Sequence, residues 1–188
     1  MPESNFARYF KINLANTLAG FLRNSNIAFE PEEYFLVVEA ERGYSNLIGR
    51  ADILIYGVFY DSLVEDGPPI STNELIAVEL EIANNYRQIL NNVEMYLDYA
   101  SGRHGKVALL QYFFPPLPFD ADKAVKDIRR LVRGERNLLY LPLIRRGIFD
   151  MRESFREVAV FFTSEDALAN LFRALDFCFP ESLAALNK

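Results

Sequence analysis

The segments ADILI at residues 51–55 and LIAVELEI at residues 75–82 decide the fold, because each has the pattern of an apolar strand interrupted by acids. In a strand, successive side chains point to opposite faces, so Glu79 and Glu81 share one face of the second segment. If the two segments pair side by side, Asp52 comes level with these two residues. The sequence therefore predicts three acids close together within apolar strands.

Two interpretations of these acids are open. Carboxylates that leave water need a partner, and a hard divalent cation with oxygen ligands would neutralise three of them. Alternatively, Glu79 and Glu81 form the solvated face of an antiparallel strand, which alternates apolar and polar residues in the same way. The apolar residues around Asp52, and the helical pattern that follows Ile82, add support for the metal cluster, and both interpretations stay open.

The segments GRADILI at residues 49–55 and AVELEI at residues 77–82 resemble the PD-(D/E)XK, or restriction-endonuclease-like, nuclease superfamily. That family presents an Asp on one strand and Glu-x-Lys on the next, within an α-β-β-β-α-β core. The resemblance covers residues from about 6 to 114. It implies an α/β fold with a mixed central sheet flanked by helices, followed here by a C-terminal β/α elaboration.

The resemblance also implies the chemistry of a metal-dependent DNA endonuclease. Asp52 and Glu79 match the metal-binding acids, and the backbone carbonyl of Leu80 is expected as a further ligand of Mg²⁺ or Mn²⁺. Glu81 stands where the family usually has Lys, and it would complete the metal shell or accept the proton of the attacking water. Lys106, at the start of a neighbouring strand, would supply the missing positive charge. The alternative is a non-catalytic binding or assembly module with the same fold.

The distribution of charge is consistent with DNA as the substrate, although the net charge is -6. Residues 29–98 hold fourteen acids and three bases, whereas residues 123–146 hold eight bases and two acids. Such an asymmetry suits an acidic metal cleft beside a basic face that holds a polyanion. The same basic residues are compatible with the solvated side of an amphipathic helix. The substrate-binding residues that we expect are Arg50, Arg87, Gln88, Arg129, Arg130 and Arg133.

Length and composition predict one soluble domain over residues 1–188, with a core over about 5–115 and an elaboration over about 116–188. Half of the residues are apolar, but no apolar run approaches the ~20 residues of a membrane span, so we expect no membrane partner. The N-terminus shows no secretion signal and Cys178 is the single cysteine, which predicts a cytoplasmic protein with Cys178 in its core. A homodimer, in which two copies cut both strands, is compatible with the sequence.

Apolar periodicity and turn residues predict the order of elements. The expected helices cover residues 5–23, 84–101, 124–132 and a last segment that opens at the capping-box pattern of 163–166. The expected strands cover residues 34–42, 50–60, 75–82, 107–114, 138–141 and 158–162. On the second helix, the expected apolar stripe is Tyr86, Leu90, Val93, Leu97 and Ala100.

Several kinds of chemistry have no support in the sequence. It contains no Gly-rich phosphate loop, no Gly-x-Ser-x-Gly elbow, no His-Glu-x-x-His motif and no paired cysteines. Nucleotide hydrolysis, serine chemistry and zinc chemistry are therefore not indicated. The only histidine, His104, is flanked by glycines and is interpreted as a turn residue, not as a general base.

Overall fold

A computed structural model describes residues 5–24, 34–40, 43–44, 48–59, 70–82, 84–147 and 160–180. Within these residues, five strands form one sheet in the order β1-β4-β5-β6-β7. The strands are β1 (Tyr34–Ala40), β4 (Ile53–Phe59), β5 (Ile70–Glu81), β6 (Val107–Phe113) and β7 (Leu138–Ile144). A separate ladder joins two short strands, β2 (Gly43–Tyr44) and β3 (Ile48–Arg50).

The sheet is mixed, because β5 pairs differently with its two neighbours. It is antiparallel to β4, with Val78 opposite Ile53, and parallel to β6, with Glu79 opposite Gln111. Strand β1 extends the antiparallel half, and β7 extends the parallel half. Parallel neighbours need a crossover connection, and α2 (Tyr86–Ser101) and α3 (Ala121–Leu131) provide one before and one after β6.

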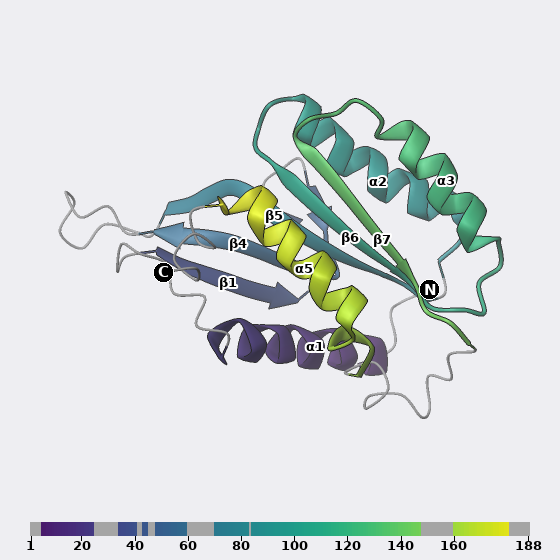
Figure 1. Cartoon of the computed structure of the whole chain (residues 1–188), viewed down its shortest axis with the longest axis horizontal. Helices are drawn as coiled ribbons and strands as arrows, with labels where there is room; N and C mark the ends of the chain where they lie inside the picture. Colours follow the sequence, from purple (N-terminus) through teal and green to yellow (C-terminus); the bar gives the residue numbers. More distant parts are fainter. Residues whose placement is uncertain are drawn as a thin grey trace.

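Helices cover both faces of the sheet. On one face, α1 (Asn5–Asn24) and α5 (Glu165–Cys178) share an apolar cluster with Ile76 and Val78 of β5. Figure 1 shows α5 crossing in front of the strands. On the other face, α2 and α3 share a cluster with Leu75 and Ala77. Strand β5 is therefore buried on both sides, which explains its nearly continuous apolar sequence.

The predicted fold class is confirmed, because the protein is an α/β structure with a mixed central sheet flanked by helices. Apart from the short β2–β3 ladder, the elements from α1 to β6 follow the expected α-β-β-β-α-β order. Strand β7 and helix α5 lie in the region predicted as an elaboration, and they extend the same sheet and the same core. Cys178 is buried there, as expected, and its Sγ donates to the Leu75 carbonyl at 3.3 Å. Among the described residues, no helix is long and apolar enough to cross a membrane.

Two strand boundaries differ from the prediction. The strand expected over residues 50–60 is interrupted at Asp52, where the chain bends between β3 and β4. The strand expected over residues 75–82 begins earlier, at Ile70, because β4 provides antiparallel partners as far as Phe59. Residues 60–69, which cover most of the connection expected between these strands, lie outside the described part of the chain.

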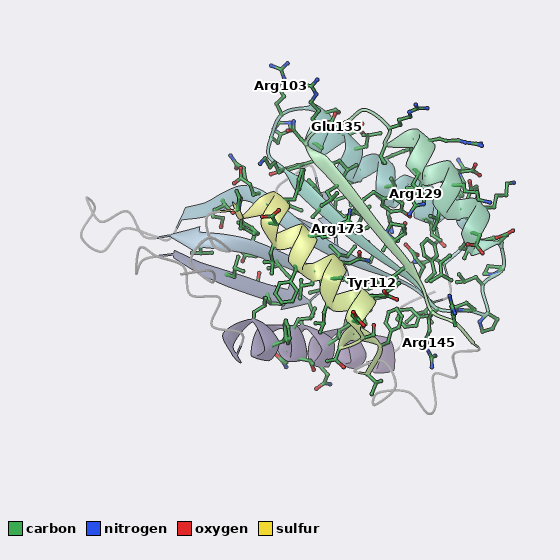
Figure 2. All side chains as sticks on the ribbon, viewed as in Figure 1. Arg103, Tyr112, Arg129, Glu135, Arg145 and Arg173 are labelled. Atoms are coloured by element: carbon green, nitrogen blue, oxygen red, sulfur yellow. The ribbon has the colours of Figure 1, made fainter. Side chains whose placement is uncertain are left out.

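The strand predicted over residues 158–162 is wrong, because residues 160–162 are helical. Phe161 and Phe162 are adjacent, yet their ring centroids lie 5.6 and 4.9 Å from that of Tyr112 on β6. Neighbouring residues of a strand point to opposite faces, so a strand would not bring both rings to one partner. Figure 2 labels Tyr112 close to α5, on the face that these rings cover.

Side-chain caps fix the starts of three helices. The Asn85 side chain accepts from the Gln88 N–H, and the Gln88 side chain accepts from the Asn85 N–H, which forms a capping box at α2. Asp120 caps α3 through the Lys123 N–H. The last helix, α5, begins within the predicted pattern, but its N-cap is Ser164, whose side chain accepts from the Ala167 N–H.

The packing of Phe161 and Phe162 against Tyr112 makes the helical turn before α5 testable by substitution. Phe162 is 4% exposed and Phe172 on α5 is 37% exposed. We expect Phe162→Ala to lower the free energy of unfolding by about 3–5 kcal/mol, because it leaves a cavity in the core. Phe172→Ala, the matched control, should cost less than about 1.5 kcal/mol, since it loses mainly an edge contact with Phe21. Urea unfolding measures both losses, and equal losses would contradict this packing.

Candidate functional site

The candidate site lies where β5 continues beyond the beginning of β4. The ladder between them ends with Ile53 opposite Val78, so the last three residues of β5 extend past it. The chain bends at Asp52, and the Leu80 N–H donates to Asp52 Oδ2 at 2.7 Å. This bond satisfies a backbone donor that has lost its strand partner. Asp52 is thereby held level with the end of β5, as the pairing of the two sequence segments suggested.

Glu79 is a buried carboxylate on the face of the sheet that α2 covers. Its side chain is 4% exposed, and the Tyr96 hydroxyl of α2 donates to Glu79 Oε1 at 2.5 Å. Burial raises the pKa of Glu79 well above its ordinary value, and the charge of Asp52 raises it further. The hydrogen bond from Tyr96 acts in the opposite direction. Glu79 is therefore held in one orientation but at an electrostatic cost.

Glu81 is fully buried and is held by two side-chain amides. The Gln111 Nε2 donates to Glu81 Oε1 at 2.7 Å, and the Asn84 Nδ2 donates to Glu81 Oε2 at 2.6 Å. The Tyr140 hydroxyl donates to Gln111 Oε1 at 2.7 Å, which extends the network to β7. Burial raises the pKa of Glu81, while the two amide bonds oppose that rise. Both carboxylate oxygens of Glu81 therefore have protein partners.

Lys11 of α1 completes the charged group, and it was not predicted from the sequence. Its Nζ lies 2.5 Å from Asp52 Oδ1, and the two side chains are 16% and 14% exposed. Residues three and four apart share a face of a helix, so Lys11 lies on the face of the buried Leu14 and Ala15. A lysine within the apolar stripe of the first helix is the signal that would have identified it.

Two buried polar residues of the site were also missed. Tyr96 lies on the buried face of α2, which consists of Ile89, Val93, Tyr96, Tyr99 and Ala100 and shares only two residues with the predicted stripe. Gln111 is the one polar residue of the fully buried strand β6. A buried polar side chain needs hydrogen-bond partners, so a lone Gln in an apolar strand was a usable signal.

The structure does not bring Lys106 to the site. Lys106 precedes β6, and Gln111, which pairs with Glu79, lies five residues further along that strand. At about 3.3 Å per residue the separation is about 16 Å. The Lys106 Nζ instead donates to the Phe177 carbonyl at 3.3 Å and lies 5.4 Å from the centroid of the Phe177 ring. The expectation that Lys106 supplies charge beside Glu81 is therefore corrected.

The first turn of α2 contains two of the expected substrate-binding residues. Arg87 and Gln88 are both exposed, a few residues after Glu81 in the chain. The Gln88 side chain takes part in the capping box, so it already has a structural role. Arg50 is the last residue of β3, and its side chain lies outside what the structure describes.

The basic residues expected to hold DNA lie on and after α3. Arg129, Arg130 and Arg133 are exposed, whereas Ala124, Val125 and Ile128 are buried, so α3 is amphipathic. Figure 2 labels Arg129 on the α3 side of the sheet.

Two interactions link this surface to the site. The Tyr86 hydroxyl, in the first turn of α2, donates to Asp127 Oδ2 of α3 at 2.8 Å. Burial raises the pKa of Tyr140, the charge of Glu81 raises it further, and the charge of Arg129 lowers it. Arg129 therefore acts electrostatically on Tyr140, whose hydroxyl donates to Gln111 of the Glu81 network.

The donor chemistry of the site suits a hard cation only in part. Asp52, in the bend before β4, and Glu79, on β5, offer carboxylate oxygens, the ligands that magnesium and manganese prefer. The described part of the chain contains no group of three or more His, Cys, Asp or Glu side chains that could hold a metal ion. The Leu80 carbonyl accepts from the Ile82 N–H at 3.1 Å. A metal site at this position would therefore rest on no more than two of the three acids.

A comparison with models of known protein families finds no match for the chain, and neither does a comparison with curated proteins.

The raised pKa of Glu79 predicts a pH-dependent cost in stability. The folded protein binds the proton of the Glu79 carboxyl group more tightly than the unfolded chain does. The stability of the protein is therefore highest below the pKa of the unfolded chain, about 4.3, and falls as the pH rises through the pKa of the folded protein. Glu79→Gln removes the charge and keeps an oxygen acceptor for Tyr96. We expect this substitution to raise the thermal midpoint by a few degrees at about pH 8. For a domain of this size, about 1 kcal/mol of added stability corresponds to about 2–4 °C.

Circular dichroism melts from about pH 4 to about pH 8, with a chelator present, test this expectation. The gain should vanish at the acid end of the range. Glu94→Gln, on an exposed position of α2, is the matched control and should leave the midpoint unchanged. A destabilising effect of Glu79→Gln at the alkaline end would show that the buried charge is not a cost to the fold.

Proposed function

We propose that the protein is a metal-dependent DNA endonuclease that hydrolyses phosphodiester bonds with Mg²⁺ or Mn²⁺. The observation that carries the proposal is the pair of buried glutamates, 4% and 0% exposed, at the end of β5 beside Asp52. Buried carboxylates reduce stability, so their presence in an apolar strand calls for a role other than folding. Carboxylates whose pKa values are perturbed by burial together with a neighbouring charge cluster at functional sites.

The residues of the chain have defined parts in this proposal. Asp52 and Glu79 would hold the metal, with the Leu80 carbonyl as a further ligand. The bound ion would polarise the scissile phosphate and lower the pKa of a water molecule. The Leu80 N–H orients Asp52, and the Tyr96 hydroxyl orients Glu79. These two hydrogen bonds fix the carboxylates in place, as hydrogen bonds to metal-ligating side chains do in many metal sites.

Glu81 is proposed to accept the proton of the attacking water. Its pKa is raised by burial, and a base with a raised pKa takes up a proton more readily at neutral pH. Gln111 and Asn84 hold both of its oxygens, so the carboxylate keeps one orientation.

DNA is the proposed substrate because α3 and the turn after it carry exposed basic residues. Arg129, Arg130 and Arg133 project from α3 and the turn after it, and α3 contacts the first turn of α2 through Tyr86. Such residues would hold the phosphate backbone without reading its sequence. Arg50, Arg87 and Gln88 are proposed as additional contacts near the scissile phosphate.

Asp52 is the residue whose replacement tests the proposal most simply. Asp52→Asn keeps an oxygen acceptor for the Leu80 N–H and loses the charge, so the fold should persist. We expect the rate of DNA cleavage to fall by about 10²–10⁴-fold, because a lost metal ligand removes several kcal/mol of transition-state stabilisation. Cleavage of single-stranded, duplex and branched DNA with magnesium or manganese is the measurement.

Asp98→Asn, at an exposed position near the end of α2, is the matched control and should cleave like the wild type. Wild-type protein that cuts none of the three DNA forms with either metal would refute the proposed activity.

A second candidate function, a non-catalytic binding or assembly module with the same fold, also has support. Glu81 replaces the lysine of the resembled motif, and both of its oxygens already have protein partners. Lys11 neutralises Asp52 without any metal. These contacts are what a purely structural network of charges would show.

A manganese titration separates the two functions. An enzyme with a metal at Asp52 and Glu79 should gain about 2.7 kcal/mol of stability when free Mn²⁺ is about 100-fold above its dissociation constant. Asp52→Asn should lose that gain. A module should show no rise in thermal midpoint for either protein, and an equal rise for both would place the bound metal elsewhere.

A further inference from the structure

Three acids and one lysine lie together at the end of β5, and the lysine comes from a different element from the acids. The Lys11 Nζ lies 2.5 Å from Asp52 Oδ1, and both side chains are largely buried. The charge of Lys11 also lowers the pKa of Glu79 and of Glu81. Lys11 therefore acts electrostatically on all three carboxylates of the site.

The position of Lys11 is fixed by the packing of α1. Leu14, Ala15 and Leu18 are buried in the cluster that also contains Ile53 and Val78 at the beginning of β4 and near the end of β5. Lys11 lies one helical turn before Leu14, on the same face. The helix is therefore docked on the strands that carry the acids, and its lysine reaches the point where those strands end.

We propose that Lys11 is a catalytic residue of the endonuclease. Its ammonium group binds the scissile phosphate and stabilises the negative charge that develops on the phosphate oxygens. An ammonium group carries three donor hydrogens, so a bond to Asp52 is compatible with a second bond to a phosphate oxygen. A compact point charge of this kind is a common phosphate ligand. The inference rests on the proposed function, and it gives the site the positive charge that neither Glu81 nor Lys106 provides.

The competing explanation is that Lys11 only holds the Asp52 carboxylate in place through their ion pair. The two roles predict opposite effects on metal binding. If Lys11 binds phosphate, its removal takes a positive charge away from the metal ligands, so metal binding should be kept or strengthened while cleavage falls. If Lys11 only holds Asp52 in place, its removal should weaken metal binding and cleavage together.

The test compares Lys11→Gln, Lys11→Arg and Lys106→Gln in the full chain. We expect Lys11→Gln to lower the DNA cleavage rate by about 10²–10³-fold, the usual effect of losing one donor to a transition-state charge. The Mn²⁺-induced rise in its thermal midpoint should equal or exceed that of the wild type. Lys11→Arg keeps the charge and should cleave faster than Lys11→Gln.

Lys106→Gln is the control, because Lys106 lies at the opposite end of β6, and its cleavage rate should match the wild type. Three results would overturn the inference: unchanged cleavage in Lys11→Gln, equal cleavage in the Gln and Arg variants, or a smaller Mn²⁺ shift that accompanies lost cleavage. If the wild type cleaves DNA, these results leave the endonuclease proposal standing. Wild-type protein without cleavage overturns both.

Discussion

The arrangement of the site depends on the hydrogen bond from the Leu80 N–H to Asp52 Oδ2. Strand β5 continues past the start of β4, and this bond supplies the partner that the ladder no longer provides. It also ties a charged side chain to the strand that carries two buried glutamates. The same contact lies where the antiparallel pairing ends, and it holds negative charge at the end of the central strand of the sheet. The parallel half of the sheet, with α2 and α3 on one face, then encloses the glutamates.

Side chains from both faces of the sheet and from its parallel strands contact the buried acids. Lys11 comes from the helix on one face, and Tyr96 comes from the helix on the other. Gln111 and Tyr140 extend the hydrogen bonds across β6 and β7. An acid, Glu81, therefore ends the central strand β5, and the lysine that pairs with Asp52 comes from the first helix.

Most of the fold and part of the site followed from local sequence patterns. The pairing of two apolar segments placed Asp52 beside the end of β5, because strand alternation and register are short-range properties. Lys11 and Tyr96 were not found. A lysine within an apolar stripe marks Lys11 as unusual, but its partner Asp52, like the partner Glu79 of Tyr96, lies far away in the sequence and no local pattern names it. The error at residues 160–162 has a similar origin, because contact with Tyr112 decides the conformation of two phenylalanines that local periodicity assigned to a strand.

We propose that Asp52 and Glu79 bind one divalent cation, and the proposed activity depends on this binding. A crystal structure of the protein soaked in manganese, with anomalous difference density recorded at the manganese absorption edge, tests it most directly. We expect a peak between the two carboxylates. Density without a peak there at saturating manganese would contradict the proposal.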